Sequence, residues 1–299
     1  MKNGLVSIMI PTYNRPQLFE QTLKSALAQD YKKVEVLVCD NSTNDDTENL
    51  IQKYAANPRL TYRRNREAKT KADNFAPFEQ MAQGEYLQWL MDDDLIMPNK
   101  ISLMVAVFKK HPNVTLVTNQ RGIIDGFNNA KGQRKCPFPI KKPYSIYPAE
   151  FAAWLSLRET SNIFGEPTAY LFRRQDLTHH YWRAEAKGLQ TISDVAMAIE
   201  LLERGDLAVF EEPLSFYRRH AGQEGQQVDI ALLSRIEWHT LCREYLTRQV
   251  FPFGNADYQM CRKNLVTEFD KSFYRLKDRA SATMWTRYTE FIEKLRRGE

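Results

Sequence analysis

Cysteine is scarce in this chain, and no cysteine lies near another in the sequence. Cys39, Cys136, Cys242 and Cys261 form no CxxC pair, and none has a histidine at metal-ligand spacing. Zinc sites and disulfide frameworks both depend on such groupings. The sequence therefore predicts neither of them, and it indicates a reducing compartment.

Long apolar runs are also absent. No stretch of about 18 apolar residues could span a bilayer, and the apolar run within residues 1–10 is too short for the core of a signal peptide. The net charge of +5 is modest and dispersed over 299 residues. It argues against nucleic acid as a partner but is compatible with an anionic substrate or a membrane surface. We expect a cytoplasmic protein, with a peripheral contact at the inner face of the membrane as an open alternative.

Short apolar segments alternate with helical patterns over the first 120 residues. Strands are predicted at residues 5–10, 34–39, 60–63, 86–91 and 114–118, and the segments between the first four strands and before the last one have helical spacing, including 72–81. Near-continuous apolar strands that alternate with helices are typical of a buried, mostly parallel sheet. We therefore predict an α/β fold, with a central sheet flanked by helices.

The pattern changes after residue 120. Residues 125–148 are rich in Gly, Pro, Asn and Lys and are predicted to form a mobile loop, either solvated or in contact with an anionic acceptor. A strand at 168–172, a helix at 194–203 and an extended segment at 208–216 follow. Beyond residue 228 the chain is almost wholly helix-compatible, and its aromatic residues fit either a core seam or a membrane or partner face.

An apolar strand that ends in three consecutive acids is the most unusual stretch of the sequence. Residues 86–91 lead directly into Asp92, Asp93 and Asp94. Three adjacent carboxylates repel one another unless a cation compensates them, and Mg²⁺ and Mn²⁺ prefer oxygen ligands. Ligands of open α/β sheets bind beyond the carboxyl ends of the strands. The triplet therefore predicts a metal site, with a solvated acidic loop before the helix at Pro98 as the alternative.

Two further polar groups are expected at the same edge of the sheet. The loop at 11–15 follows the first strand and offers a hydroxyl group, an aromatic ring and a cation, and Asp40 follows the second strand. A carboxylate in that place can accept hydrogen bonds from a base or a ribose. The glycine-rich phosphate loops GxGxxG and GxxxxGK[ST] are both missing. We therefore predict a nucleotide pocket in which a metal, rather than backbone amides, neutralises the phosphates.

These motifs, in this order, resemble glycosyltransferase family 2, whose members transfer sugars from nucleotide donors and have the Rossmann-like GT-A fold. The resemblance covers residues 5–118, with the run at 6–15, the segment at 36–42, Asn74, Gly84 and the acidic triplet, and it continues more loosely to His220. It implies that the triplet is the DxD motif of the family. The nucleotide-binding residues that it implies are Pro11, Thr12, Tyr13, Arg15, Asp40, Asn74, Asp92, Asp93 and Arg219. The ligands that it implies for Mn²⁺ or Mg²⁺ are Asp94, Asp92 and His220, with Asp94 favoured.

The family also uses an acid near the start of a later helix as general base, typically within a Glu-Asp pair. Asp194 matches that acid, and Ser193 stands in the place of its Glu neighbour. A helix cap formed by either residue is the alternative interpretation.

The resemblance implies an inverting transfer from a nucleotide sugar, with a UDP-sugar favoured, to a hydroxyl group of a glycan or glycolipid, as in bacterial surface polysaccharide synthesis. It divides the chain into a GT-A domain at 1–225, with a nucleotide-binding half at 1–119 and an acceptor half at 120–225, and a helical extension at 226–299. Two alternatives stay open. One is a sugar-phosphate nucleotidyltransferase, although the loop at 11–15 is not the glycine-rich loop of those enzymes. The other is a non-catalytic binding subunit.

Overall fold

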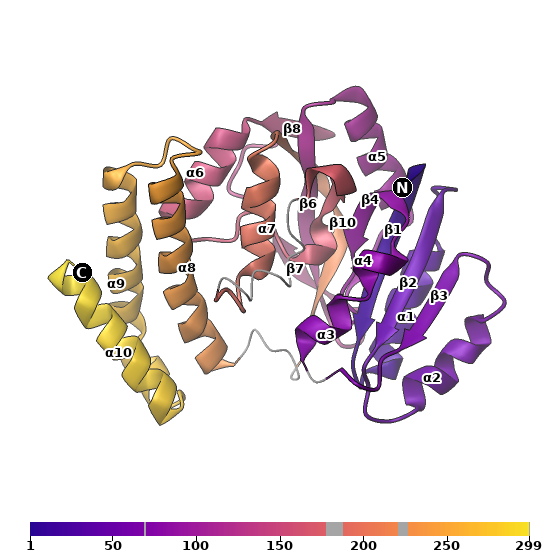
Figure 1. The fold of residues 1–299 in the computed structure, drawn as a ribbon, viewed down its shortest axis with the longest axis horizontal. Coiled ribbons are helices and arrows are strands. Elements are labelled where there is room, and N and C mark those ends of the chain that lie inside the picture. The colour runs from indigo at the N-terminus through magenta and orange to yellow at the C-terminus, as the bar shows by residue number, and fades with distance from the viewer. Residues whose placement is uncertain (69, 178–187, 221–226, 299) are drawn as a thin grey trace.

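The computed structural model describes residues 1–68, 70–177, 188–220 and 227–298. Within these residues a ten-stranded, mostly parallel sheet is flanked by helices (Figure 1). The strand order is β3-β2-β1-β4-β9-β6-β10-β5, with β7 paired to β6 and β8 paired to β10. The predicted α/β class with a helical C-terminal part is therefore confirmed.

Four parallel strands from the first 90 residues form one side of the sheet. They are β1 (Lys2–Thr12), β2 (Val34–Asp40), β3 (Leu60–Arg64) and β4 (Gly84–Trp89). Because these strands are parallel, their carboxyl ends meet at one edge, where Thr12 lies opposite Asp40 and Asp40 lies opposite Arg64. This edge receives the loop after β1 and the acidic triplet after β4.

Apolar residues pack on both faces of the sheet, as near-continuous apolar strands require. Along β1, Ile8 and Ile10 join a cluster under α1 (Pro16–Leu27) and α5 (Lys100–Lys110), whereas Met9 joins a second cluster on the opposite face. Residues that alternate along a strand point to opposite faces. Short helices α2 (Asp46–Ile51), α3 (Lys71–Phe75) and α4 (Phe78–Met81) complete this half, so the helix predicted at 72–81 is two short helices.

The second half extends the sheet with longer strands than the sequence predicts. β6 (Val114–Asp125) pairs in parallel with β10 (Asp206–Arg219). β9 (Leu171–Arg173) joins β6 to β4, and β5 (Leu95–Ile96) pairs with β10.

The prediction of a loop across residues 125–148 is wrong in part. β7 (Ala130–Arg134) forms an antiparallel hairpin with β6, and β8 (Tyr144–Tyr147) pairs with β10. All five residues of β7 are exposed, so the strand carries no apolar signal, and backbone hydrogen bonds alone identify it. The predicted strand at 168–172 is instead a 3-10 turn (Pro167–Ala169) followed by β9.

Helices form the remainder of the chain. α6 (Ala149–Glu159) and α7 (Ser193–Leu202) lie between the sheet and α8 (Val228–Arg248), α9 (Asn255–Lys277) and α10 (Ala282–Arg297), as Figure 1 shows. The second apolar cluster continues from the sheet through α6 and α7 into these last helices. The predicted boundary between 225 and 226 falls at residues 221–226, which lie outside the described residues.

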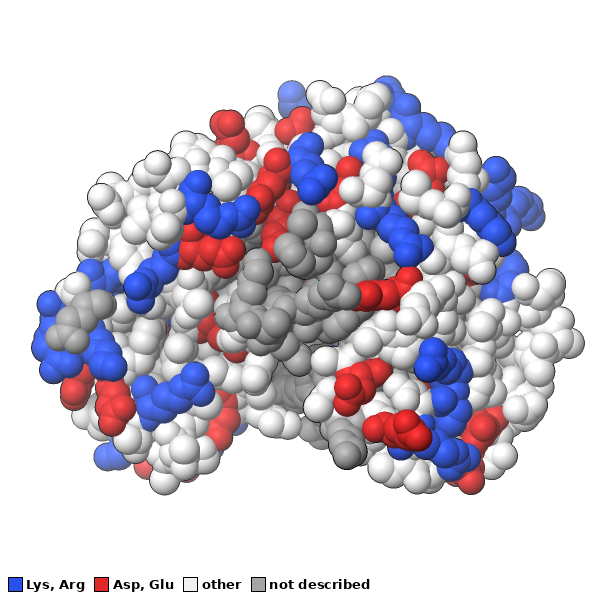
Figure 2. All heavy atoms as spheres, viewed as in Figure 1, with Lys and Arg blue, Asp and Glu red and all other residues white. Residues whose placement is uncertain are grey.

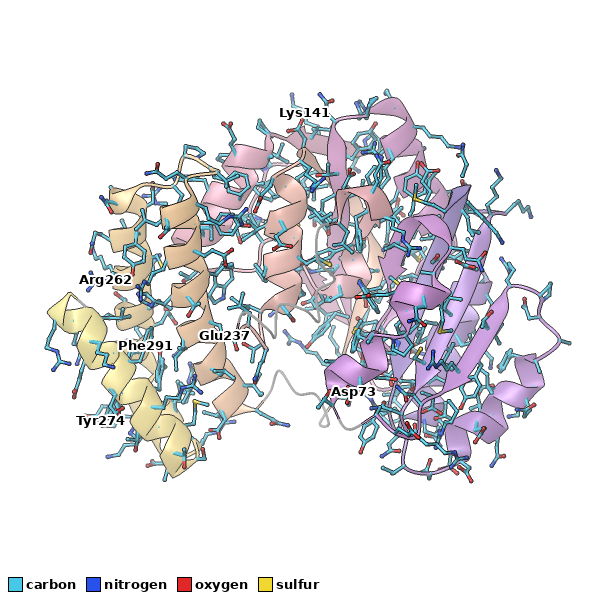
Figure 3. All side chains as sticks on the ribbon, viewed as in Figure 1. Asp73, Lys141, Glu237, Arg262, Tyr274 and Phe291 are labelled. Atoms are coloured by element: carbon cyan, nitrogen blue, oxygen red, sulfur yellow. The ribbon has the colours of Figure 1, made fainter. Side chains whose placement is uncertain are left out.

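The aromatic residues of the last helices mostly form a core seam. Phe269 lies 5.6 Å from Tyr288 and 6.0 Å from Trp285 between ring centroids, whereas Tyr274 is 86% exposed (Figure 3). Lys and Arg side chains gather at the α9–α10 end of the face in Figure 2. In the part of the chain that the structure describes, no helix has both the length and the apolarity needed to cross a bilayer. All four cysteines are buried and free.

Candidate active site

Asp92 joins the end of β4 to the loop after β1. Its Oδ2 accepts hydrogen bonds from Thr12 Oγ1 at 2.9 Å and from the backbone N–H of Tyr13 at 3.2 Å. Its Oδ1 lies 3.0 Å from a guanidinium nitrogen of Arg15. Burial raises the pKa of Asp92 to about 7, while the Arg15 guanidinium opposes this shift and the Asp93 carboxylate adds to it. The loop after β1 and the triplet, which the sequence predicts at the same edge of the sheet, are thus in contact through Asp92.

Asp93 lies at the meeting point of three segments. Its Oδ2 accepts a hydrogen bond from Arg15 Nη1 at 2.8 Å and lies 3.0 Å from His220 Nε2, just beyond β10. Asp93 is 8% exposed, more than either neighbouring acid. A carboxylate and an imidazole therefore converge at the most exposed acid of the triplet.

Asp94 points into the protein. Its Oδ2 accepts a hydrogen bond from Thr168 Oγ1 at 2.6 Å, and its Oδ1 accepts one from the backbone N–H of Arg218 at 3.0 Å. Only 1% of the residue is exposed, and burial, together with the Asp93 charge, raises the pKa of Asp94. The sequence favoured Asp94 as the metal ligand. Both of its oxygens accept hydrogen bonds inside the protein, so a metal bound to Asp94 would have to displace one of these donors.

Asp40 is held by its neighbours on β3 and in the loop that follows β2. Its Oδ2 accepts hydrogen bonds from Tyr62 Oη at 2.8 Å and from the Arg64 guanidinium, and its Oδ1 accepts the backbone N–H of Ser42 at 2.8 Å. The residue is fully buried. The direct contact with a base or ribose that the sequence predicts would require one of these donors to give way.

The other predicted nucleotide-binding residues lie near this edge and differ in how exposed they are. Pro11 is buried within β1, and Asn74 donates its Nδ2–H to the carbonyl oxygen of Thr12 at 3.4 Å. Asn74 Oδ1 is buried and has no hydrogen-bond partner among the described residues. Tyr13 is 48% exposed, and Arg219 is exposed at the end of β10. These two side chains are therefore open to a ligand, whereas Pro11 only shapes the loop.

Arg218 belongs to the run at 217–220 that resembles the family's late Arg-x-His element, but the sequence predicts no ligand-binding role for it. It is fully buried, and its Nε–H donates to the carbonyl oxygen of Asp93 at 2.6 Å. Its Nη1 donates to the carbonyl oxygen of Asp125 at 2.9 Å and to Asn128 Oδ1 at 2.6 Å. Arg218 thus ties the triplet to the β6–β7 hairpin. Its place as the first residue of the Arg-x-His element was the signal that the sequence offered.

Asp194 lies in the first turn of α7, near the segment that also holds the triplet. Asn162 Nδ2 lies 3.4 Å from Asp194 Oδ2, and Thr168, six residues later, holds Asp94. Asp194 thus contacts one end of the segment 162–168, whose other end holds Asp94. The N-cap residue of α7 is Ile192, so neither Ser193 nor Asp194 occupies the capping position.

The residues at the edge fit a hard divalent cation in one way only. Among the described residues, no three His, Cys, Asp or Glu side chains form a ligand cluster. Mg²⁺ and similar ions are, however, commonly held by one or two protein carboxylates together with substrate phosphates. Asp93 and His220 provide such a partial set, which phosphate oxygens of a nucleotide would complete.

Comparison with known proteins gives a consistent picture. The family model described as "Glycosyl transferase family 2" matches residues 7–179. An uncharacterized glycosyltransferase of Rickettsia conorii is 36% identical over 129 residues, which cover 42% of this chain and 21% of that protein. WfaP of Escherichia coli, named a UDP-Glc:alpha-D-GlcNAc-diphosphoundecaprenol beta-1,3-glucosyltransferase, is 37% identical over 98 residues, which cover 33% of this chain and 39% of WfaP. The chain thus spans well under half the length of these relatives.

Two solved structures resemble the fold over nearly the whole chain. S. aureus TarS 1–349 in complex with UDP-GlcNAc has a TM-score of 0.63 at 14% identity, covering 97% of this chain and 81% of that one. The mannosyltransferase PcManGT from Pyrobaculum calidifontis, in complex with GDP-Man and Mn²⁺, has a TM-score of 0.54 at 16% identity and covers 97% and 83%. At these identities the likeness concerns the fold, which is GT-A.

Proposed function

This chain belongs to glycosyltransferase family 2, and we propose that it is an inverting, metal-dependent glycosyltransferase that uses a UDP-sugar and a hydroxyl group of a glycan or glycolipid. The observation that carries the proposal is the convergence of Arg15 and His220, which are distant in sequence, on Asp93 within 3.0 Å. A carboxylate, an imidazole and a guanidinium that meet at one point suit a metal-bound diphosphate.

The donor would lie across the carboxyl ends of β1, β2 and β4. Asp93 and His220 would hold Mn²⁺ or Mg²⁺, and Arg219 and Arg15 supply positive charge for the phosphates. Such an ion would neutralise charge on the diphosphate. The exposed ring of Tyr13 offers an apolar face to the base. Asp92, which is fixed by Thr12, lies on the ribose side of this arrangement.

The reaction would be a single displacement at the anomeric carbon. Asp194 accepts the proton of the acceptor hydroxyl, the hydroxyl oxygen forms the new glycosidic bond, and the bond to the nucleoside diphosphate breaks. Because attack and departure take place on opposite faces of the sugar, the configuration is inverted. Arg15 stabilises the negative charge of the departing diphosphate.

The donor and acceptor classes rest on relatives. A neighbour in fold is complexed with UDP-GlcNAc, and the name of the E. coli relative specifies UDP-Glc and a diphosphoundecaprenol-linked acceptor. These names support a UDP-sugar and a lipid-linked sugar as substrates. Such an acceptor would place the reaction at the inner face of a membrane, in agreement with the free cysteines of this chain. The GDP-Man complex of another neighbour makes a GDP-sugar the second candidate donor.

Ligand-induced shifts of the melting temperature test the donor side. A ligand that binds only the folded state raises that temperature, so we expect a shift with UDP and Mn²⁺ together that is absent with EDTA. A shift with GDP and Mn²⁺ but not with UDP would contradict the UDP assignment. No shift with either nucleotide would contradict a nucleotide-sugar donor.

UDP release tests the chemistry. The wild type should release UDP from UDP-glucose or UDP-N-acetylglucosamine, faster when alkyl glycosides are present. Asp194→Asn should keep the UDP·Mn²⁺ shift but lose roughly 10²–10⁴-fold in rate. Glu211→Gln, which removes an acid paired with Lys142 at 3.6 Å, serves as the control and should leave both unchanged. Binding of UDP without any release would favour the non-catalytic alternative.

A further inference from the structure

Glu237 of α8 forms a dense set of hydrogen bonds with the segment that enters α7. It is a carboxylate only 2% exposed. Its Oε1 accepts the backbone N–H of Gln190 at 2.9 Å. Its Oε2 accepts the N–H and the hydroxyl group of Thr191 at 2.8 and 2.6 Å, and the N–H of Ile192 at 3.2 Å. Figure 3 shows Glu237 on the side of α8 that faces α7.

These bonds fix the segment that leads into α7, a helix without a side-chain cap of its own. Ser281 caps α10 by accepting the N–H of Met284, and Thr70 caps α3 in the same way. At α7 the N-cap residue is Ile192, which has no side-chain acceptor. A buried backbone N–H needs a partner, and a negative charge beside a helix N-terminus is favourable. Glu237 supplies both from a separate helix, 45 residues further along the chain.

We propose that Glu237 is a positioning residue for Asp194, and that α8 thereby fixes the geometry of the active site. This inference rests on the proposed function, in which Asp194 is the general base. Asp194 follows Ile192 by two residues and lies in the first turn of α7. The place of that turn therefore depends on how α8 docks against it.

α8 also holds the opposite end of α7, which provides a matched control. Glu203, the C-cap residue of α7, accepts a hydrogen bond from Tyr245 Oη at 2.6 Å and one from Arg248 Nη2 at 2.6 Å. Glu203 and Glu237 thus link the same two helices, about 15 Å apart along α7. Only Glu237 adjoins the turn that carries Asp194.

The test compares Glu237→Gln with Glu203→Gln by UDP release and by melting temperature. In Glu237→Gln an amide N–H₂ faces the N–H donors of residues 190–192. We expect the rate to fall roughly 10- to 100-fold, the scale of a small misplacement of a catalytic group, while the UDP·Mn²⁺ affinity stays within about twofold. Glu203→Gln should lower the melting temperature and keep the rate within about twofold. Equal rates for wild type and Glu237→Gln would overturn the inference.

A double-mutant cycle with Asp194→Asn separates positioning from general stability. If Glu237 acts through Asp194, adding Glu237→Gln to Asp194→Asn should cause no further loss of rate. Losses that multiply would overturn the inference. Thr191→Val removes only the hydrogen bond from the Thr191 hydroxyl group to Glu237 and should lower the rate severalfold without unfolding the chain. This variant serves as the test if Glu237→Gln folds poorly.

The cycle also distinguishes this inference from the proposed function. An active wild type that Asp194→Asn disables, combined with an unaffected Glu237→Gln, refutes only the positioning role. A wild type that neither binds UDP with Mn²⁺ nor releases UDP from a donor refutes the proposed function, and the positioning role with it.

Discussion

Replacing Asp93 or Asp94 by Asn should have opposite effects on stability and on nucleotide binding, although the two residues are adjacent. Asp94 accepts hydrogen bonds from Thr168 and from the backbone of Arg218. In Asp94→Asn the side-chain amide has one oxygen, which can accept only one of these two hydrogen bonds well, and its N–H₂ group faces the other donor. A hydrogen bond to a charged group contributes about 1.5–3 kcal/mol. Because burial raises the pKa of Asp94, the relief of a buried charge offsets part of that loss.

The net cost of Asp94→Asn is therefore on the order of 2 kcal/mol. A change of 1 kcal/mol shifts the melting temperature by roughly 2–4 °C in chains somewhat smaller than this one. We expect the ligand-free protein to melt about 4–8 °C lower, while the UDP·Mn²⁺ shift persists.

Asp93→Asn should behave in the reverse manner. The charge of Asp93 raises the pKa of both Asp92 and Asp94, so its removal relieves repulsion. The ligand-free melting temperature should stay equal to that of the wild type or rise. At a nucleotide concentration 100 times the dissociation constant, binding stabilises the wild type by about 2.7 kcal/mol, and Asp93→Asn should lose most of this gain.

Thermal melting with and without UDP and Mn²⁺ measures the ligand-free melting temperature and the ligand-induced shift of each variant, with Glu211→Gln as the control. The reasoning is refuted if Asp94→Asn abolishes the ligand shift at an unchanged ligand-free melting temperature. It is equally refuted if Asp93→Asn keeps the full shift.

Three further changes test other parts of the structure. Burial lowers the pKa of His239 to about 4. As the pH falls below 6.5, this histidine takes up a proton in the unfolded chain but not in the folded one. The free energy of unfolding should therefore fall by roughly 3 kcal/mol from pH 7 to pH 4. His239→Gln should remove that part of the pH dependence in urea titrations. Gly165 has a φ of +104°, and a Cβ there would lie 2.3 Å from Arg121 Nη1, so Gly165→Ala should cost at least about 1–3 kcal/mol in the same assay. Arg64→Met removes the cation beside the buried Asp40 carboxylate and should lower the free energy of unfolding by about 3–5 kcal/mol; an unchanged free energy of unfolding would contradict this reasoning.

The sequence predicted the strands whose burial dictates their composition. β1, β2 and β4 are buried on both faces, so their apolar runs identify them, with errors of a few residues at the ends. β7 was missed because all five of its residues are exposed, and its hydrogen bonds to β6 involve backbone atoms that no composition records. The helix predicted at 72–81 is interrupted at Pro77, because proline lacks the backbone N–H that a continuous helix needs.

The residues of the candidate site divide in the same way. Motifs within one segment, such as the loop after β1 and the acidic triplet, could be predicted because their residues are neighbours in sequence. Thr168, Arg218 and Glu237 reach their partners across 74, 124 and 45 residues. Nothing in a single sequence pairs such positions. Which acid of the triplet faces outward also depends on the turn after β4, which only the fold determines.

The structure changes the argument for a metal. From the sequence, three adjacent carboxylates call for a divalent cation to offset their repulsion. In the fold, each acid has its own compensation: Arg15 pairs with Asp92 and Asp93, while Thr168 and the backbone of Arg218 donate to Asp94. The fold thus offsets part of the repulsion without an ion, although the Asp93 charge still raises the pKa of Asp92 and Asp94. The case for a metal now depends on Asp93 and His220. His220→Asn should therefore weaken the rise in melting temperature that UDP and Mn²⁺ cause together. Mn²⁺ without nucleotide should leave the melting temperature of the wild type unchanged.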